Sequence, residues 1–309
     1  MTVKDMKFTG FSQRMPRIAV GCMRFSESSV SDMNAFIHAA LDEGCFFFDH
    51  ADIYGGGKCE ELFGKAIAED SSIKREDIII QSKCGVKIGI DYDLSKEHIL
   101  KSVDGSLKRL GVDYLDTLLL HRPDALYEPE EIAEALDTLK SNGKVRAFGV
   151  SNFKPLQIEL LKKYVNQPLI INQIQFSIPA SSSIAASMEM NLPTDGAVDR
   201  DGNVLDYCRL NDIVIQAWSP FQTPDRSGLF FTDPRYEELN KTVKEVAAKY
   251  GVSDTTIAAA WVFRHPANIQ LVSGTTKIDR FKELVAAADV ELTREDWYKL
   301  YLSAGHILP

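Results

Sequence analysis

The chain has 309 residues, of which 45% are hydrophobic and 26% charged, and its formal net charge is −9 at pH 7. This composition supports a large core and excludes a globally disordered chain, and the negative charge disfavours nucleic acid as a partner. The sequence has no apolar run long enough for a signal peptide or a membrane helix, so we expect a cytoplasmic protein without membrane contact.

Eight short runs of β-branched and aromatic residues recur along the chain, and each is followed by an amphipathic stretch. The predicted strands span residues 17–20, 45–48, 78–81, 114–120, 145–150, 169–174, 213–217 and 269–272. Alternation of this kind is typical of strand–helix units that feed a parallel sheet.

Capping residues mark the ends of the predicted helices. Ser31 or Asp32 is expected to begin the first helix. The third predicted helix begins at Ser95 and ends at Gly111, and the fourth begins near Pro129. The regular spacing of these helices favours a closed arrangement.

The unbroken series of eight units predicts a single-domain (β/α)8 TIM barrel over residues 1–309. An open doubly wound sheet is the alternative, but only Gly21 stands where that fold carries a glycine-rich turn after its first strand. Three irregular stretches interrupt the pattern, namely residues 1–16, 176–202 and 219–233. Loops this long inside a compact domain are usually functional, so we expect 176–202 and 223–231 to form the pocket walls.

Polar residues stand at the carboxyl ends of consecutive predicted strands, which a barrel gathers on its active-site face. These residues are Asp49, Lys83, His121, Ser151, Asn152, Gln173 and Ser219. Five residues beyond Asp49, Tyr54 lies on a glycine-rich loop that is long enough to reach the same face. Together these side chains predict a catalytic site at the barrel mouth.

The residue types in this group fit the protonation of an oxyanion. Tyr54 is a phenol with an ordinary pKa of about 10, and the ammonium group of Lys83 is expected to favour its phenolate. Asp49 would hold Lys83 in place, and a neutral His121 would orient a carbonyl oxygen. Since the sequence shows no nucleophile elbow, acidic dyad or metal cluster nearby, a bound hydride donor is the simplest source of the attack on carbon.

Several segments carry a resemblance to the aldo-keto reductases that spans nearly the whole chain. They are FFFDHADIYGGGKCEELFGKAI, IIIQSKCG, LGVDYLDTLLLHRPD, GKVRAFGVSNF, INQIQFS, IQAWSPF and SGTTKIDR. The family's catalytic tetrad matches Asp49, Tyr54, Lys83 and His121. The DHADIYG and HRPD motifs are similar to a bacterial oxidoreductase branch of that family. The resemblance implies an NADPH-dependent oxidoreductase that reduces an aldehyde or ketone, with Tyr54 as the proton donor.

The same resemblance implies a set of cofactor-binding residues. They are Gly21, Met23, Ser151, Asn152, Gln173, Trp218, Ser219, Pro220, Phe221, Gly274, Thr275, Thr276 and Arg280. Trp218 stands where the family usually has the tyrosine that stacks on the nicotinamide. Leu284 stands where many members have an asparagine against the adenine. No metal ligands are implied.

Some interpretations remain open at this point. Arg24 either guards the pocket mouth or forms a surface salt bridge, and His50 has no assigned role. The five cysteines lack CxxC spacing, which predicts buried free thiols. Two alternatives to a reductase stay open, namely a cofactor-binding sensor or regulatory subunit and a barrel isomerase that handles phosphate. The expected partner is a small carbonyl substrate, and the expected state is a monomer or weak homo-oligomer.

Overall fold

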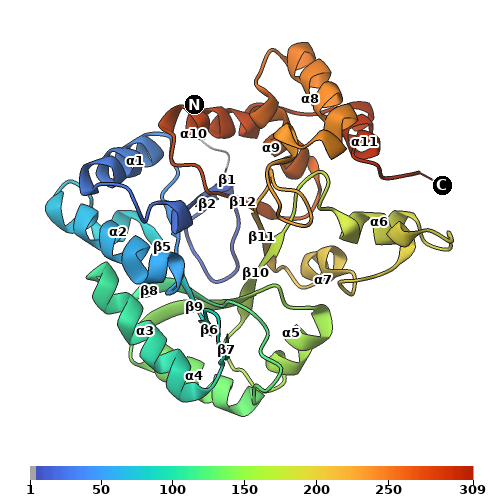
Figure 1. The fold of residues 1–309 in the computed structure, drawn as a ribbon. Coiled ribbons are helices and arrows are strands. Elements are labelled where there is room, and N and C mark those ends of the chain that lie inside the picture. The colour runs from blue at the N-terminus through green and yellow to red at the C-terminus, as the bar shows by residue number, and fades with distance from the viewer. Residues whose placement is uncertain (1–4, 309) are drawn as a thin grey trace.

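The computed structural model describes residues 5–308, which form a closed barrel of eight parallel strands surrounded by helices (Figure 1). Neighbouring strands follow one another as β3, β4, β5, β8, β9, β10, β11 and β12, and β12 pairs with β3 to close the ring. Their bounds are Ile18–Gly21, Phe47–Asp49, Ile79–Cys84, Leu115–Leu120, Val145–Ser151, Leu169–Gln175, Val214–Trp218 and Ile269–Ser273. The predicted (β/α)8 barrel and its eight strands are confirmed.

Helices follow the strands and cover the outside of the barrel (Figure 1). Those of the eight repeating units are α1 (Val30–Asp42), α2 (Lys58–Glu69), α3 (Lys96–Leu110), α4 (Pro129–Ser141), α5 (Pro155–Lys162), α7 (Val204–Leu210), α9 (Asp254–Arg264) and α10 (Ile278–Ala286). Three further helices are α6 (Ser182–Met188), α8 (Glu237–Tyr250) and α11 (Arg294–Ser303). Among residues 5–308, no helix is long and apolar enough to cross a membrane.

Side-chain caps fix where several helices begin. Ser95 accepts a hydrogen bond from the backbone N–H of His98 at the start of α3, as predicted, and Gly111 ends that helix with φ of 65°. The prediction for α1 was wrong, because Ser29 is its N-cap. The Ser29 hydroxyl accepts the Asp32 N–H at 3.0 Å, and the Asp32 carboxylate accepts the Ser29 N–H at 3.2 Å. This reciprocal capping box starts the helix earlier than Ser31.

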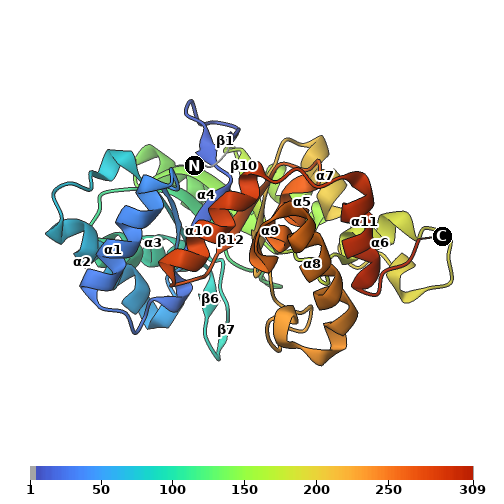
Figure 2. The same cartoon turned by 90° about the horizontal axis from the view of Figure 1, so that it is seen from above.

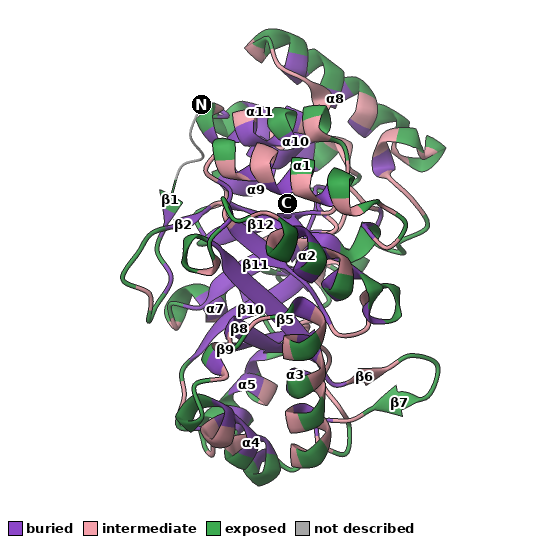
Figure 3. Ribbon diagram, turned by 90° about the vertical axis from the view of Figure 1, so that its left-hand side faces the viewer, coloured by how far each residue is buried: buried purple, intermediate pink, exposed green. Residues whose placement is uncertain are grey.

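The barrel strands separate two apolar cores, because successive side chains point to opposite faces. The larger core lies between strands and helices, and a smaller one lies inside the barrel. A hairpin of β1 (Asp5–Met6) and β2 (Met15–Pro16) closes the inner core, where the ring centroids of Phe8 and Phe47 are 5.8 Å apart. Figure 3 shows that most of the barrel strands are buried. The irregular stretch 1–16 therefore includes a structural plug rather than a pocket loop.

A second hairpin projects from the opposite end of the molecule to the β1–β2 hairpin (Figure 2). It consists of β6 (Val86–Lys87) and β7 (Asp91–Tyr92), and it follows β5 directly. This position puts it at the carboxyl ends of the barrel strands. The hairpin thus marks the face on which the site residues were predicted to gather.

Candidate active site

A layer of glutamine side chains crosses the barrel interior above the inner apolar core. Gln216 accepts hydrogen bonds from the side-chain amides of Gln81 and Gln173, each at 2.8 Å, and donates to Gln270 at 2.8 Å. Gln81 and Gln173 also donate to a carboxylate oxygen of Asp49, at 2.5 and 3.1 Å. Because all these groups are buried, the layer holds the Asp49 carboxyl group in one position as a hydrogen-bond acceptor.

Lys83 joins Asp49 to Tyr54 at the centre of the site. Its buried ammonium group lies 2.7 and 2.8 Å from the two carboxylate oxygens of Asp49. It also donates to the backbone carbonyl of His50 at 2.7 Å and to the hydroxyl oxygen of Tyr54 at 3.0 Å. Since the ammonium group donates to the phenol oxygen, the hydrogen of Tyr54 is left to point elsewhere.

Three glycines give the loop after β4 the shape that brings Tyr54 over the barrel. Gly55, Gly56 and Gly57 have φ of 58°, 65° and 96°, a conformation that side chains with a Cβ rarely adopt. A Cβ on Gly55 would also come within 2.8 Å of the side chain of Ser26. The glycine run of the sequence is therefore required for the tight turn between Tyr54 and α2.

Burial and charge shift the pKa of Tyr54 in opposite directions. Burial raises it, the neighbouring charge of Lys83 lowers it, and the net pKa lies above the ordinary value. The prediction that Lys83 would favour the phenolate was correct for that one effect but wrong for the net direction. For Lys83 itself, burial lowers the pKa, but the charges of Asp49 and Tyr54 outweigh burial and raise it. The pair therefore rests as a protonated phenol beside an ammonium group.

Both histidines near the cluster are neutral. Burial and the charge of Lys83 lower the pKa of His50 to about 3, and they hold the pKa of His121 well below its usual range. The His121 ring packs edge-on against Tyr54, with centroids 6.0 Å apart. His50 packs against Phe63, and its contribution to the cluster is its backbone carbonyl. His121 is thus suited to orient an oxygen as a neutral imidazole.

A cavity of about 780 Å³ opens above these side chains. All the catalytic and cofactor residues predicted from the sequence line it except Lys83, which lies beneath Tyr54, and Thr276. The prediction of pocket walls was correct for 223–231, from which Arg226, Leu229 and Phe231 face the cavity. It was wrong for 176–202, because α6 packs on the outside of the barrel and lines a separate cavity of about 400 Å³.

A chain of hydrogen bonds runs along the middle of the cavity wall. The indole N–H of Trp218 donates to Asn152 at 3.1 Å, the Asn152 amide donates to Ser151 at 2.7 Å, and Ser151 donates to the Gln173 carbonyl at 2.9 Å. Asn152 and Ser219 both have positive φ, at 62° and 51°. Strained backbone of this kind is common where side chains must be aimed at a ligand.

The part of the cavity wall that Arg280 lines carries a positive charge, and two buried polar atoms of the wall have no hydrogen-bond partner. Arg280 is exposed there beside Thr275, and the buried Leu284 closes the wall. Within residues 5–308, the hydroxyl of Ser273 and the side-chain oxygen of Asn240 are buried without hydrogen-bond partners. These features fit a ligand with a phosphate at this part of the wall.

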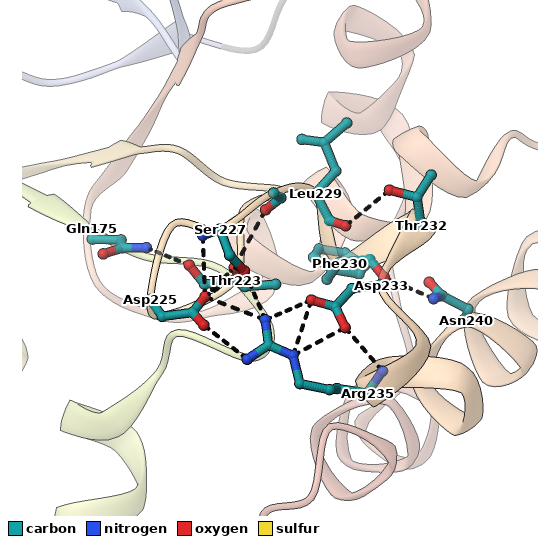
Figure 4. A network of polar contacts seen from close by, with 11 residues as sticks. Gln175, Thr223, Asp225, Ser227, Leu229, Phe230, Thr232, Asp233, Arg235 and Asn240 are labelled. Carbon is teal, nitrogen blue, oxygen red and sulfur yellow. Dashed lines mark hydrogen bonds and ion pairs between the residues drawn. The ribbon is translucent and has the colours of Figure 1, made fainter.

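The loop 219–233 covers part of the cavity and is held by Arg235. The Arg235 guanidinium binds Asp225 at 2.8 Å and Asp233 at 2.6 Å, and it donates to Ser227 at 2.7 Å (Figure 4). Asn240 of α8 binds the carbonyl of Phe230 at 2.7 Å and ties the far end of the loop to that helix. The loop is therefore built as a defined wall.

Sequence reasoning missed several residues of the cavity. Ser273 directly follows a predicted strand and Arg122 comes directly after His121 at the end of another, so the rule that selected the other strand ends would have found them. Asn240 and Lys244 come from α8, and no pattern in the sequence indicates that this helix reaches the cavity. Arg24 lies at the mouth, with Nε 4.0 Å from the position that a Cβ on Gly274 would take. Within residues 5–308, Arg24 lines the cavity and forms no salt bridge, so the structure does not support the surface ion pair, and a role at the pocket mouth stays a prediction.

The five cysteines are buried and free, and within the described chain no group of acidic, histidine or cysteine side chains is arranged to hold a metal ion. The site therefore offers acid–base groups, amides and several cationic side chains, among them Arg280. These suit a ligand that combines an amide-bearing ring with phosphates.

Comparison with known proteins finds a family model and related chains that match nearly the whole sequence. Residues 17–301 match the model of the Aldo/keto reductase family. The chain is 35% identical to the uncharacterized oxidoreductase YcsN of Bacillus subtilis (strain 168), over 95% of this chain and 96% of the relative. It is 33% identical to a 6-dehydroglucose reductase of Agrobacterium fabrum, over 94% of each chain.

A solved structure of similar shape carries a nicotinamide cofactor. It is the aldo-keto reductase from Klebsiella pneumoniae in complex with NADPH, which is 26% identical and has a TM-score of 0.76. The match covers 97% of this chain and 94% of the other.

Proposed function

This chain belongs to the aldo/keto reductase family, and we propose that it uses NADPH to reduce a small aldehyde or ketone, with Tyr54 as the proton donor. The observation that carries the proposal is the buried cluster in which Lys83 binds both Asp49 and Tyr54 beneath the cavity. The NADPH bound to the similar reductase from Klebsiella pneumoniae supports the choice of cofactor.

The residues present fit a nicotinamide dinucleotide. Gln173 uses its amide N–H groups on Asp49 and Gln216, which leaves its carbonyl oxygen to accept from a carboxamide. Asn152 would contact the same group, and Trp218 offers an aromatic face beside it. Elsewhere on the cavity wall, Arg280 provides the guanidinium for a 2′-phosphate. When bound, NADPH supplies the hydride that reduces the carbonyl carbon.

The protein's own residues then manage the carbonyl oxygen. The hydroxyl of Tyr54 and the ring of His121 both face the cavity, so each can donate a hydrogen bond to that oxygen. As negative charge develops there, Tyr54 transfers its proton. The adjacent ammonium of Lys83 stabilises the phenolate that remains, and Asp49 keeps the ammonium in place.

An isotope experiment tests this assignment. The protein is incubated with NADPH deuterated at the transferable C4 position and with benzaldehyde, and the benzyl alcohol is analysed by mass spectrometry. We expect one deuterium on the carbinol carbon, where it does not exchange with water. Binding of NADPH with no turnover of any aldehyde, ketone or quinone in a panel would favour the sensor alternative instead.

A further inference from the structure

Two arginines of the site belong neither to the tetrad nor to the proposed cofactor set. Arg122 follows β8 directly after His121, and Arg226 lies in the loop 219–233. Both line the cavity. They are close enough that the charge of Arg226 adds to burial in lowering the pKa of Arg122. The barrel mouth thus concentrates positive charge in a protein whose net charge is −9.

Neither guanidinium has an anionic partner within residues 5–308, where no ion pair or side-chain hydrogen bond involves Arg122 or Arg226. Their neighbours in sequence are already engaged. Asp124 accepts the backbone N–H groups of Leu94 and Leu126 at 3.1 and 2.8 Å. Asp225 is bound by Arg235, as Figure 4 shows. These two acids therefore have other partners, and neither forms an ion pair with Arg122 or Arg226.

Because Arg122 is partly buried, the lack of an anionic partner is energetically unfavourable for its guanidinium group. The guanidinium is partly buried, with its central carbon 5.8 Å from the ring of Trp218. A desolvated charge without a counter-charge is unfavourable, and it is relieved when an anion binds beside it. Arg122 directly follows His121, and both line the same cavity as Tyr54, so such an anion would lie near the reacting carbonyl.

The backbone of Arg226 is strained in the turn that carries this residue. Arg226 has φ of 60°, a left-handed conformation that disfavours long side chains. The turn is closed by hydrogen bonds from Arg226 N to the Thr223 carbonyl and from Thr223 N to the Gly228 carbonyl, both at 3.0 Å. The contacts of Arg235 with Asp225 and Asp233 anchor it from outside (Figure 4). Glycine would suit the backbone at position 226 better, so the arginine side chain has a role other than shaping the turn.

We propose that Arg122 and Arg226 form an anion subsite, and that the carbonyl substrate carries a carboxylate or phosphate group bound there. This inference rests on the proposed reductase function and assigns its substrate class. The subsite differs from the phosphate end of the cofactor site, where Arg280 stands, and from Arg24, which lies against Gly274.

The test compares carbonyl compounds that differ in one charged group. The first pair is 4-formylbenzoate and its methyl ester, and the second is glyceraldehyde 3-phosphate and glyceraldehyde. We expect kcat/KM for the anion of at least one pair to exceed that for its neutral partner by ten- to a hundredfold, the range of a charge-assisted hydrogen bond. The pair with the larger ratio identifies the anionic group. Raising the salt concentration should reduce that ratio.

Variants test whether the side chains of Arg122 and Arg226 cause the preference for the anionic substrate. Arg122→Met and Arg226→Gly should each lower the anion-to-neutral ratio about tenfold or more through KM, and Arg122→Lys should restore part of it. Arg226→Gly should keep or raise the melting temperature, since glycine suits the positive φ. The matched control is Arg209→Met, which removes the same charge from α7 at the other end of the barrel and should leave the ratio unchanged.

Three results would overturn the subsite. They are equal kcat/KM within both pairs for the wild-type protein, an unchanged ratio in both variants, and a loss of NADPH affinity in Arg122→Met and Arg226→Gly in place of the change in KM. Any of these with continued turnover of neutral aldehydes would leave the proposed reductase intact. Absence of turnover with every carbonyl compound despite NADPH binding would refute the reductase, and the subsite with it.

Discussion

Replacing Tyr54 with phenylalanine isolates the proton transfer from everything else in the site. The phenyl ring keeps its edge-on contact with His121, and Lys83 keeps three other contacts, two with Asp49 and one with the His50 carbonyl. What disappears is the hydroxyl 3.0 Å from the ammonium group. Tyr54→Phe should therefore change chemistry much more than structure.

In Tyr54→Phe, the effect on kcat should be larger than the effect on the free energy of unfolding. Loss of a general acid lowers kcat by about 10²–10⁴-fold, which corresponds to about 3–5 kcal/mol in the barrier. Loss of one of several hydrogen bonds to Lys83 should lower the free energy of unfolding by only about 1 kcal/mol, a shift in melting temperature of about 2–4 °C. The affinity for NADPH should change little, because the Tyr54 hydroxyl is bound to Lys83 rather than to the Ser151–Asn152–Trp218 wall.

Single-turnover kinetics at saturating NADPH measures the chemical step directly, and fluorescence titration measures NADPH binding. Tyr164→Phe, which removes a hydroxyl outside the cavity after α5, is the matched control and should behave as the wild type. A Tyr54→Phe protein that binds NADPH and reduces a good aldehyde at the wild-type rate would refute the proposed mechanism.

Four further predictions concern charge and binding. Lys83→Met should lower kcat about as much as Tyr54→Phe does, and it should reduce the free energy of unfolding by about 3–5 kcal/mol, since it leaves Asp49 buried without a cation. In single-turnover kinetics, the double variant Tyr54→Phe/Lys83→Met should be little slower than either single variant. Arg280→Ala should weaken NADPH about ten- to a hundredfold and NADH little, by titration; equal losses would make Arg280 structural. A hundredfold excess of NADPH over its Kd should stabilise the fold by about 2.7 kcal/mol without added metal, by thermal shift. Burial raises the pKa of Asp52 to about 7, so its ionisation weakens the fold as pH rises from about 4 through 7; Asp52→Asn should raise the melting temperature more at pH 8 than at pH 5.

The sequence predicted most of the fold because periodicity and strand ends carry local information. Each barrel strand is a short apolar run, and the polar residue that ends it falls on the same face as its neighbours. This rule alone selects Asp49, Lys83 and His121. Helix starts were less certain, since Ser29, Ser31 and Asp32 are all good caps and only the geometry shows which one closes the box.

Contributions from loops and distant helices could not be predicted in the same way. Whether 176–202 faces the mouth depends on α6 packing against the outside of the barrel, and Asn240 reaches the cavity only because α8 packs beside the loop 219–233. Arg122 was visible in the HRPD motif, but its lack of a partner depends on Asp124 being engaged by Leu94 and Leu126. These are properties of tertiary contacts, which no local pattern records.

The pKa of Tyr54 shows why the sequence indicated the wrong net direction of the pKa shift. It also shows why burial and the charge of Lys83, which act in opposite directions, are both useful. From sequence, the visible influence is the cation of Lys83, which favours the phenolate. The structure adds burial, which raises the pKa and keeps the proton on the phenol at neutral pH. A donor that had already lost its proton would be useless, and one in a purely apolar site would leave an unstable phenolate. Burial retains the proton in the resting state, and Lys83 lowers the free energy of the phenolate only as transfer proceeds, so the site needs the two effects together.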